Sequence, residues 1–433
     1  MEHRRFVYSE RTMTMRAGTN SIGPWTLLAF LSLVFVLNYV DRQIVFAIFP
    51  LLRHDLGFTD TQLGLAGSVF TWTYSLSMPF TGRLADVVPR HRMVIAALAL
   101  WSAVTAATAM SHTVNQFLFW RFLMGLSEAL YVPAGIGLIT EAHPGTTRSR
   151  ALAIHGFAQF TGITLGGWYG GWSAEHIGWR TGFLILGGVG VCYSCIVAAR
   201  FRGFESTIVR KPSPGSSPLD IARSRCYLTL CVAFLTFCSM LWMLYAWLPN
   251  YVYETFHLSL SGSGLTATLY LQISSACGSL LGGWTGDRVS RVVPTGRFRI
   301  VVAGLLTCAP FAFGIYHSTS LIALKLCACG FGLCAGFFIA NAFASAYDVI
   351  EPRNFGLATG LMNMLGGWGG GAAILLTGVF KKSLGTGGLM LYASGTAMIL
   401  AVVLLIVVEK RYVREHQYAR EGTGVPELQS ARG

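Results

Sequence analysis

The chain has 433 residues, of which 53% are hydrophobic and only 12% are charged, and it contains 50 glycines. This composition excludes an ordinary soluble protein, which carries about 25% charged residues, and it also excludes disordered, collagen-like and disulfide-scaffold chains. A polytopic membrane protein remains, and its net charge of +13 has to be compared with the basic character of cytoplasmic loops before nucleic acid is considered.

Apolar stretches long enough to cross a bilayer predict an all-α membrane protein with twelve transmembrane helices. They lie at 25–49, 61–81, 93–111, 116–139, 151–172, 180–199, 227–252, 263–284, 299–316, 320–348, 356–380 and 387–408. The first is too long for a signal-peptide core and lacks a cleavage site, so we expect it to be retained.

The longest polar interval divides the spans six and six. We therefore predict two pseudo-symmetric six-helix bundles at 25–199 and 227–408, joined by a linker at 200–226. An N-terminal tail at 1–24 and a C-terminal tail at 409–433 flank the bundles.

The distribution of Lys and Arg predicts the orientation. With a cytoplasmic N-terminus, 25 of the 32 basic residues fall in cytoplasmic segments, and the other side holds only Arg53, Arg180, Lys381 and Lys382. Both termini are therefore predicted to be cytoplasmic, in the plasma (inner) membrane. The same distribution explains the positive charge without nucleic acid.

The expected partners are the lipid bilayer and a small-molecule substrate, with the protein working as a monomer.

Two motifs recur at nearly one offset. Gly82-Arg-Leu-Ala-Asp86 closes the second span and Gly283-Trp-Thr-Gly-Asp287-Arg288 closes the eighth, 201 residues later. Gly166-Gly-Trp-Tyr-Gly-Gly171 in the fifth span pairs with Gly366-Gly-Trp-Gly-Gly-Gly371 in the eleventh, 200 residues later. Matches in corresponding helices predict parallel six-helix repeats, an architecture found in one large transporter class.

The chain resembles the major facilitator superfamily over roughly residues 22–410. The loop Gly82-x-Leu84-Ala85-Asp86-x-x-x-Arg90-His91-Arg92 is similar to the family's signature loop, with Val87 and Pro89 in place of its usual Arg and Gly. Other typical motifs are Arg121-Phe-x-x-Gly125-x-x-Glu128, Gly178-Trp179-Arg180 and Trp247-Leu248-Pro249. The segment 38–43 and the context of Glu128 resemble Spinster-like members, and the anion:cation symporter branch, which carries organic anions, is nearly as close.

The resemblance implies a cytoplasmic gate. Asp86 would dock on the N-terminus of the eleventh span near Phe355, where the helix dipole stabilises a carboxylate by about 0.3–1 kcal/mol. Asp287 would mirror it at the start of the fifth span near Arg150. The other residues assigned to the gate are Gly82, Arg90, Glu141, Arg148, Gly283 and Arg288. The alternative is that these are solvated loop charges.

Five ionisable residues lie within predicted spans: Asp41, Arg42, Arg121, Glu128 and Lys325. Each costs about 2.5–3.5 kcal/mol at mid-bilayer, so each is expected to face a cavity or a partner. Arg121 and Glu128 share one helix face about 10 Å apart, whereas Asp41 and Arg42 point about 100° apart. We predict Asp41 and Glu128 as proton-coupling carboxylates. The alternative for Asp41 is a structural pairing with Arg121, and Lys325 is expected to snorkel.

Arg42 and Arg121 are the predicted substrate-binding cations. Other polar or aromatic side chains in the spans are candidates for the substrate cavity, although helix-to-helix hydrogen bonding is the alternative for each: Tyr39, Gln159, Trp242, Tyr245, Gln272, Asn341 and Asn363. We find no metal-ligand spacing and no Ser-His-Asp motif, so neither a metal site nor an enzyme is expected. The glycine pairs predict close helix packing.

The absence of a Gly-Lys-Ser/Thr phosphate loop from the sequence excludes an ATP-driven pump, so no cofactor is expected and a proton gradient would supply the energy. The sequence thus predicts a secondary transporter of a small organic solute, an organic anion, by alternating access with proton coupling. Substrate bound to Arg42 or Arg121 would release a carboxylate to take a proton. The alternatives are a Spinster-like exporter of lysolipid or amphipathic drug, and a nontransporting membrane sensor.

Overall fold

The computed structural model describes residues 22–143, 145–201 and 218–421, and all regular structure in these ranges is helical. Most of both predicted tails and of the predicted linker lie outside the described residues. The helices of the first half are α1 (Pro24–Ala47), α2 (Phe49–Leu56), α3 (Asp60–Val87), α4 (Arg90–Thr108), α5 (Val114–Ala129), α6 (Tyr131–Ala142), η1 (Gly145–Thr147), α7 (Arg148–His176) and α8 (Trp179–Arg200). Those of the second half are α9 (Pro218–Arg223), α10 (Arg225–Phe256), α11 (Leu260–Val292), α12 (Gly296–His317), α13 (Leu321–Tyr347), η2 (Pro352–Asn354) and α14 (Phe355–Glu421).

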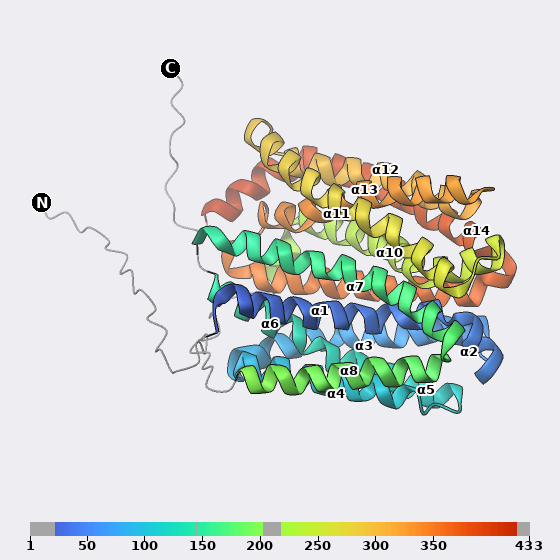
Figure 1. Ribbon diagram of the computed structural model, residues 1–433. Coiled ribbons are helices and arrows are strands. Elements are labelled where there is room, and N and C mark those ends of the chain that lie inside the picture. Colours follow the sequence, from blue (N-terminus) through green and yellow to red (C-terminus); the bar gives the residue numbers. More distant parts are fainter. Residues whose placement is uncertain (1–21, 144, 202–217, 422–433) are drawn as a thin grey trace, which may run out of the picture.

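The long helices lie side by side in one elongated bundle (Figure 1). The helix α1 begins, and α14 ends, at the same end of the molecule, which we call the terminal end. The other end, where α2 and the last turns of α10 lie, is called the opposite end.

The helices confirm the predicted all-α fold with its twelve spans. In the part of the chain that the structure describes, eight helical stretches are long and apolar enough to cross a membrane. One of them is the long α14 stretch, which contains the last two predicted spans. The other spans are α3, α7 and α11, of 28, 29 and 33 residues, whose many Gly, Ser and Thr residues lower their hydropathy.

Two spans differ in detail from the sequence prediction. The fourth is broken at Leu130 into α5 and α6, three residues before Pro133, which has no backbone N–H to donate. The last two spans form one helical run, interrupted at Gly385, whose φ of 68° is open to glycine but strained for other residues. After Gly385 the helix continues to Glu421, well beyond the predicted end at 408.

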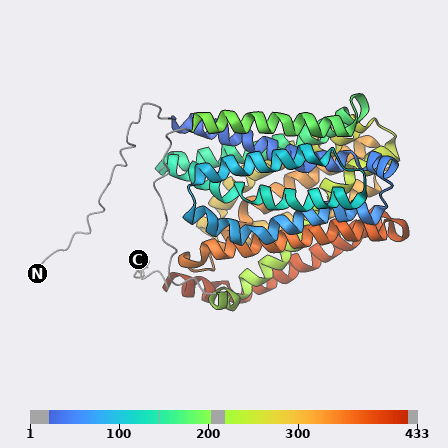
Figure 2. The same ribbon diagram turned by 90° about the horizontal axis from the view of Figure 1, so that it is seen from below.

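The contacts between helices follow the same pattern in each half. Residues 22–201 form the N-terminal half, in which α1 packs on α7, α4 on α8 and α3 on α5. Residues 218–421 form the C-terminal half, in which α10 packs on α14, α11 on α13, and α12 on both α13 and α14. The main contacts between the halves are α3 with α14 and α7 with α11 (Figures 1 and 2). These are spans two with eleven and five with eight, as expected for a repeated unit.

The predicted glycine packing is confirmed, and it faces two ways. A Cβ on Gly166 or Gly170 would come within 2.8 Å of backbone carbonyl oxygens of α1, inside the same half. A Cβ on Gly171 would lie 2.3 Å from the backbone of Leu260 in α11, across the interface between the halves. In α14, Gly366 likewise abuts α10, while Gly371 abuts Trp72 of α3. In both α7 and α14, one set of glycines thus packs against a helix of the same half, and the other set packs against a helix of the other half.

The close approaches between the halves are concentrated towards the opposite end. A Cβ on Gly64 of α3 or on Gly378 of α14 would meet backbone of the other half within 2.8 Å. Nearer the terminal end of α3 and α7, a Cβ on Gly82 or Gly156 would meet no heavy atom within 4 Å. The halves therefore contact each other closely at the opposite end. At the terminal end, Gly82 of α3 and Gly156 of α7 make no such close contact.

We expect Gly171→Ala to destabilise this arrangement, because the added methyl group has no room against the α11 backbone. The cost of overpacking is about 1–3 kcal/mol, which should lower the melting temperature of the purified protein. The matched control is Gly188→Ala on α8, where a Cβ meets no heavy atom within 4 Å. Equal melting temperatures for the two variants would contradict the proposed close contact.

Candidate functional site

A buried ion pair joins α1 to α5 inside the N-terminal half. The Nε of Arg42 donates to Oε2 of Glu128 at 2.6 Å, and both side chains are almost fully buried. Charges taken out of water need a close partner and further hydrogen bonds to offset their desolvation. The sequence singled out both residues but did not predict that they would pair with each other.

Aromatic rings surround the two arginines of this site. The guanidinium carbon of Arg42 lies 4.7 Å from the ring centre of Tyr39 and 4.2 Å from that of Tyr74. The guanidinium carbon of Arg121 lies 4.4 Å from the ring centre of Phe70. Cation–π contacts of this kind reach about 2 kcal/mol where water is excluded. Phe70 and Tyr74 were not predicted, although their four-residue spacing places them on one face of α3.

Asp41 and Arg42 turn to different helices, as their 100° separation predicts. Oδ1 of Asp41 accepts a hydrogen bond from Oγ1 of Thr105 in α4 at 2.9 Å. Arg121 instead donates from Nε to the carbonyl oxygen of Ala66 at 3.1 Å. The alternative in which Asp41 pairs with Arg121 is therefore not the arrangement seen here. The role of Asp41 in proton coupling stays a prediction.

Several buried polar atoms of this site have no hydrogen-bond partner among the described residues. They are Nη2 of Arg42, Nη1 and Nη2 of Arg121, and Oε1 of Glu128. Buried polar groups are nearly always hydrogen-bonded to protein, water or ligand. Three cationic donor groups and one carboxylate oxygen can together receive an anionic group and a proton. We call Asp41, Arg42, Arg121 and Glu128 the charged site.

The remaining predicted cavity residues fall into two groups. Trp242 and Tyr245 lie together on α10 with ring centres 5.9 Å apart, and the carbonyl oxygen of Tyr245 accepts a hydrogen bond from Gln43 of α1 at 3.0 Å. On α7 and α11 respectively, Gln159 is half-buried and Gln272 is buried.

By contrast, Asn341 donates to the carbonyl oxygens of Gly282 and Phe337, and exposed Asn363 donates to that of Thr359 in its own helix. Asn341 thus makes the helix-to-helix hydrogen bond that was its alternative, whereas the bond of Asn363 stays within α14. Their role in substrate binding, like that of Gln159 and Gln272, stays a prediction.

At the terminal end, two acidic residues near the ends of α3 and α11 form matching clusters. Asp86 lies 3.9 Å from Nη2 of Arg90, and Arg90 also forms an ion pair with Glu141. In the other half, Asp287 lies 3.0 Å from Arg297, which also contacts Asp348 at 3.3 Å. Each cluster is an acid–arginine–acid triad confined to its own half. Arg297 and Asp348 were not predicted, because the repeat offset of 201 residues points from Arg90 and Glu141 to Arg291 and Ala342 instead.

The predicted gate contacts across the halves are not made in this arrangement. Within the described residues, the ion pairs of Asp86 and Asp287 stay in their own halves. Arg288 lies over the ring of Trp284 at 4.0 Å, and Arg148 is exposed at the start of α7. Neither Gly82 nor Gly283 has a heavy atom near its Cβ position. A clamp at the terminal end stays a prediction for a state in which that end is closed.

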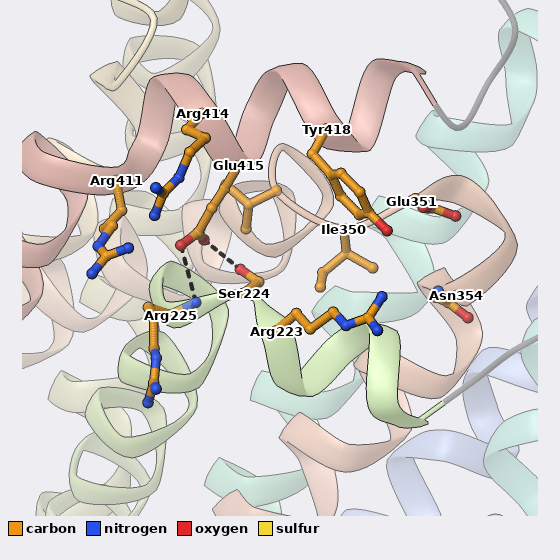
Figure 3. Close-up of a pocket in the computed structure, with 11 residues that line it drawn as sticks. Arg223, Ser224, Arg225, Ile350, Glu351, Asn354, Arg411, Arg414, Glu415 and Tyr418 are labelled. Atoms are coloured by element: carbon orange, nitrogen blue, oxygen red, sulfur yellow. Dashed lines mark hydrogen bonds between the residues drawn. The ribbon is translucent and has the colours of Figure 1, made fainter.

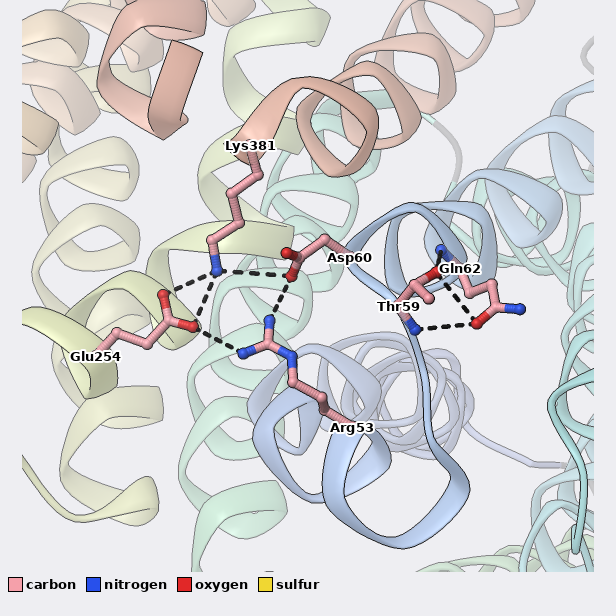
Figure 4. Close-up of polar contacts among 6 residues, drawn as sticks. All are labelled: Arg53, Thr59, Asp60, Gln62, Glu254 and Lys381. Carbon is pink, nitrogen blue, oxygen red and sulfur yellow. Dashed lines mark hydrogen bonds and ion pairs between the residues drawn. The ribbon is translucent and has the colours of Figure 1, made fainter. Parts of the chain in front are cut away.

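At the opposite end, four charges do bridge the halves (Figure 4). Arg53 of α2 and Asp60 of α3 come from the N-terminal half, and Glu254 of α10 and Lys381 of α14 come from the C-terminal half. Arg53 is 3.1 Å and Lys381 is 2.8 Å from oxygens of Glu254. Lys381 also lies 3.8 Å from Asp60, which is hydrogen-bonded to Arg53. Each carboxylate therefore contacts a cation from both halves.

Local structure positions this four-charge cluster. Thr59 caps α3 by accepting from the backbone N–H of Gln62, whose side chain accepts in return from the N–H of Thr59 (Figure 4). Asp60 is thereby placed in the first turn of α3, where a negative charge is favourable. The sequence missed the cluster. The signal was that Arg53 and Lys381 are two of only four basic residues on the side predicted to be poor in them.

We expect Glu254→Gln to weaken the closure at the opposite end, because the amide no longer attracts Arg53 and Lys381. Partly exposed ion pairs contribute about 0.2–1 kcal/mol each, and Glu254 makes two of them, so the open population should rise about twofold to thirtyfold. Distances between spin labels at His54 and Tyr253, measured by double electron–electron resonance, report this change.

The control is Glu409→Gln, which removes an ion pair with Arg299 that lies inside the C-terminal half and is more exposed than those of Glu254. Unchanged distance distributions in the Glu254 variant would show that the cluster does not hold the halves together.

Comparison with known proteins agrees with this geometry. A family model described as Major Facilitator Superfamily matches residues 31–324 and 230–431. A probable sulfoacetate transporter of Cupriavidus necator is 25% identical over 86% of this chain and 90% of its own length. The D-galactonate transporter of Escherichia coli is 22% identical over 88% of this chain and 94% of its own.

Solved structures share the fold. A bacterial homologue of the human lysosomal transporter Spinster, in an inward-facing and occupied conformation, superposes with a TM-score of 0.73. Its sequence is 17% identical, and the match covers 93% of this chain and 99% of that one. The unoccupied inward-facing form gives a TM-score of 0.72.

Proposed function

Because the chain belongs to the major facilitator superfamily, we propose that it carries a small organic anion across the plasma membrane in symport with protons. The observation that carries this proposal is the charged site, where Arg42 is already bound by a carboxylate, that of Glu128. A site that binds an internal carboxylate this closely has the chemistry to bind a substrate carboxylate. Buried Nη atoms of Arg42 and Arg121 without hydrogen-bond partners among the described residues supply further donors.

The names of the relatives support an organic acid as substrate. They include transporters of sulfoacetate, D-galactonate, galactarate or D-glucarate, and hexuronate. Each of these names denotes a small organic acid. Arginine suits such groups, because its planar fork of N–H donors matches the two oxygens of a carboxylate.

Competition for Arg42 supplies the coupling between proton and substrate. A proton on Glu128 removes the negative charge that holds Arg42, which leaves the guanidinium free for the carboxylate of the substrate. Loss of that proton restores the internal ion pair and displaces the substrate. Asp41, beside Arg42 on α1, is the second carboxylate of the charged site and can add a further proton. Protons and anion would then cross together, drawn by the proton gradient.

Alternating access would exchange the contacts at the two ends. We assign the terminal end to the cytoplasm, because most of the basic residues lie in segments at that end. The arrangement described here then has its outer side closed by the four-charge cluster and by glycine contacts. In the other state, Asp86 and Asp287 would dock across the halves at the terminal end.

The orientation can be tested with single cysteines in a variant otherwise free of cysteine. A cysteine that replaces Lys410, in the last part of α14, should react with a membrane-impermeant maleimide only after the cells are permeabilised. A cysteine at Lys382 should react in intact cells. The reverse pattern would invert the proposed topology.

We expect Glu128→Gln to abolish accumulation of substrate driven by a pH gradient, while exchange of labelled for unlabelled substrate continues. The amide keeps the size of the side chain but can neither bind nor release a proton. Transport in proteoliposomes, with and without an imposed pH gradient, separates the two activities. Glu128→Asp retains an acid and should keep part of the coupling. Accumulation that survives both Glu128→Gln and Asp41→Asn would overturn the coupling scheme.

The substrate class is tested by a panel of labelled sugar acids, monocarboxylates and lysophospholipids in the same proteoliposomes. Movement of an acid that depends on the gradient and is lost in Arg42→Lys supports the proposal, because lysine cannot reproduce the fork of donors. The Spinster-like fold leaves a lipid carrier as the second candidate. Movement of lysophospholipid alone would favour that candidate and reject the organic-anion assignment.

A further inference from the structure

A cavity of about 300 Å³ lies at the terminal end of the C-terminal half, away from the charged site. It is enclosed by α9, the start of α10, the turn between α13 and η2, and the last turns of α14 (Figure 3). Four arginines contribute to its wall: Arg223, Arg225, Arg411 and Arg414. The charged site is built from α1 and α5, so the transport scheme gives this cavity no role.

The acidic residues of the cavity are already occupied by other groups. Glu415 accepts hydrogen bonds from Oγ of Ser224 at 2.7 Å and from the backbone N–H groups of Arg225 and Cys226 at 3.1 Å. Its carboxylate thus caps the first turn of α10, as Figure 3 shows for Ser224 and Arg225. Glu351 pairs with Arg353 at 2.6 Å. Glu351 is thus paired with a cation outside the wall, whereas Glu415 leaves one negative charge among the arginines.

Three of these arginines have no ion-pair partner in the ranges that the structure describes: Arg225, Arg411 and Arg414. The three positive charges of Arg225, Arg411 and Arg414 therefore exceed the one negative charge of Glu415, which accepts hydrogen bonds only from neutral groups. The rest of the wall is largely apolar. Val349 and Ile350 are buried, and in Figure 3 the ring of Tyr418 lies near Ile350. The cavity combines a net positive charge with an apolar surface.

We propose that this cavity binds the phosphate group of an acidic phospholipid headgroup. Arginine forks bind phosphate through paired hydrogen bonds. Basic pockets between transmembrane helices at the cytoplasmic side recognise acidic headgroups in this way. Val349, Ile350 and Tyr418 provide the apolar contact that a glycerol backbone needs. The bound lipid would hold the end of α14 against the end of α9 and the start of α10, at the terminal end of the C-terminal half.

The test uses the purified full-length chain in mild detergent. Its melting temperature is measured while dihexanoyl phosphatidylglycerol, dihexanoyl phosphatidylcholine or inorganic phosphate is added. We expect phosphatidylglycerol to raise the melting temperature at lower concentration than the other two. In the variant Arg411→Gln/Arg414→Gln, about tenfold more phosphatidylglycerol should be needed, because two charges near the headgroup are lost.

The matched control is Lys410→Gln, which removes one exposed positive charge from the same turn of α14 but does not line the cavity. It should behave as the parent protein. Should the double variant fail to fold, Arg225→Gln tests the cavity from α10 instead. Equal responses to phosphatidylglycerol and phosphatidylcholine, or equal losses in the control and the cavity variants, would overturn the site. Protection by inorganic phosphate alone, lost in the cavity variants, would retain a phosphate site but reject the lipid.

Discussion

The ion pair between Arg42 and Glu128 is the constraint on which the rest of the site depends. A charge within the bilayer is tolerated only beside a partner, and here each ion is nearly inaccessible to water. The pair is neutral only while Glu128 is ionised. Protonation of Glu128 leaves an unpaired cation, which an anion can then neutralise. Binding of the proton and of the anion must therefore strengthen one another by the same factor, whichever binds first.

The contacts between the halves are weaker individually than this pair. The four-charge cluster at the opposite end is partly exposed, so each of its ion pairs contributes little and can be broken at small cost. The glycine contacts of Gly64, Gly171 and Gly378 instead depend on shape, because they require the two backbones to meet directly. Shape determines how closely the halves fit, and the charges set their register. Neither contribution is large enough to lock the molecule in one state.

The spans could be predicted from sequence because hydrophobicity over about 20 residues is a local property. The glycine motif and the motif that ends in Asp86 or Asp287 each occur once in either half, and this repetition revealed the two halves. The packing of Gly166 and Gly170 followed from their spacing. What sequence could not supply was which helices lie beside each other. The direction of Arg42 relative to Asp41 was predictable, but its partner Glu128 lies 86 residues away. The four-charge cluster joins residues as distant as Arg53 and Lys381, and only the folded arrangement brings them together.

The distribution of charge between the halves explains why both halves are needed. All four residues of the charged site belong to the N-terminal half, whereas the C-terminal half contributes the neutral side chains of Trp242 and Tyr245 from α10. The two sides are linked by the hydrogen bond from Gln43 to the carbonyl oxygen of Tyr245. In the proposed scheme, a ligand held by the arginines would be completed on its other side by the side chains of Trp242 and Tyr245. Movement of the C-terminal half can then change access to the site while the paired charges keep their partners.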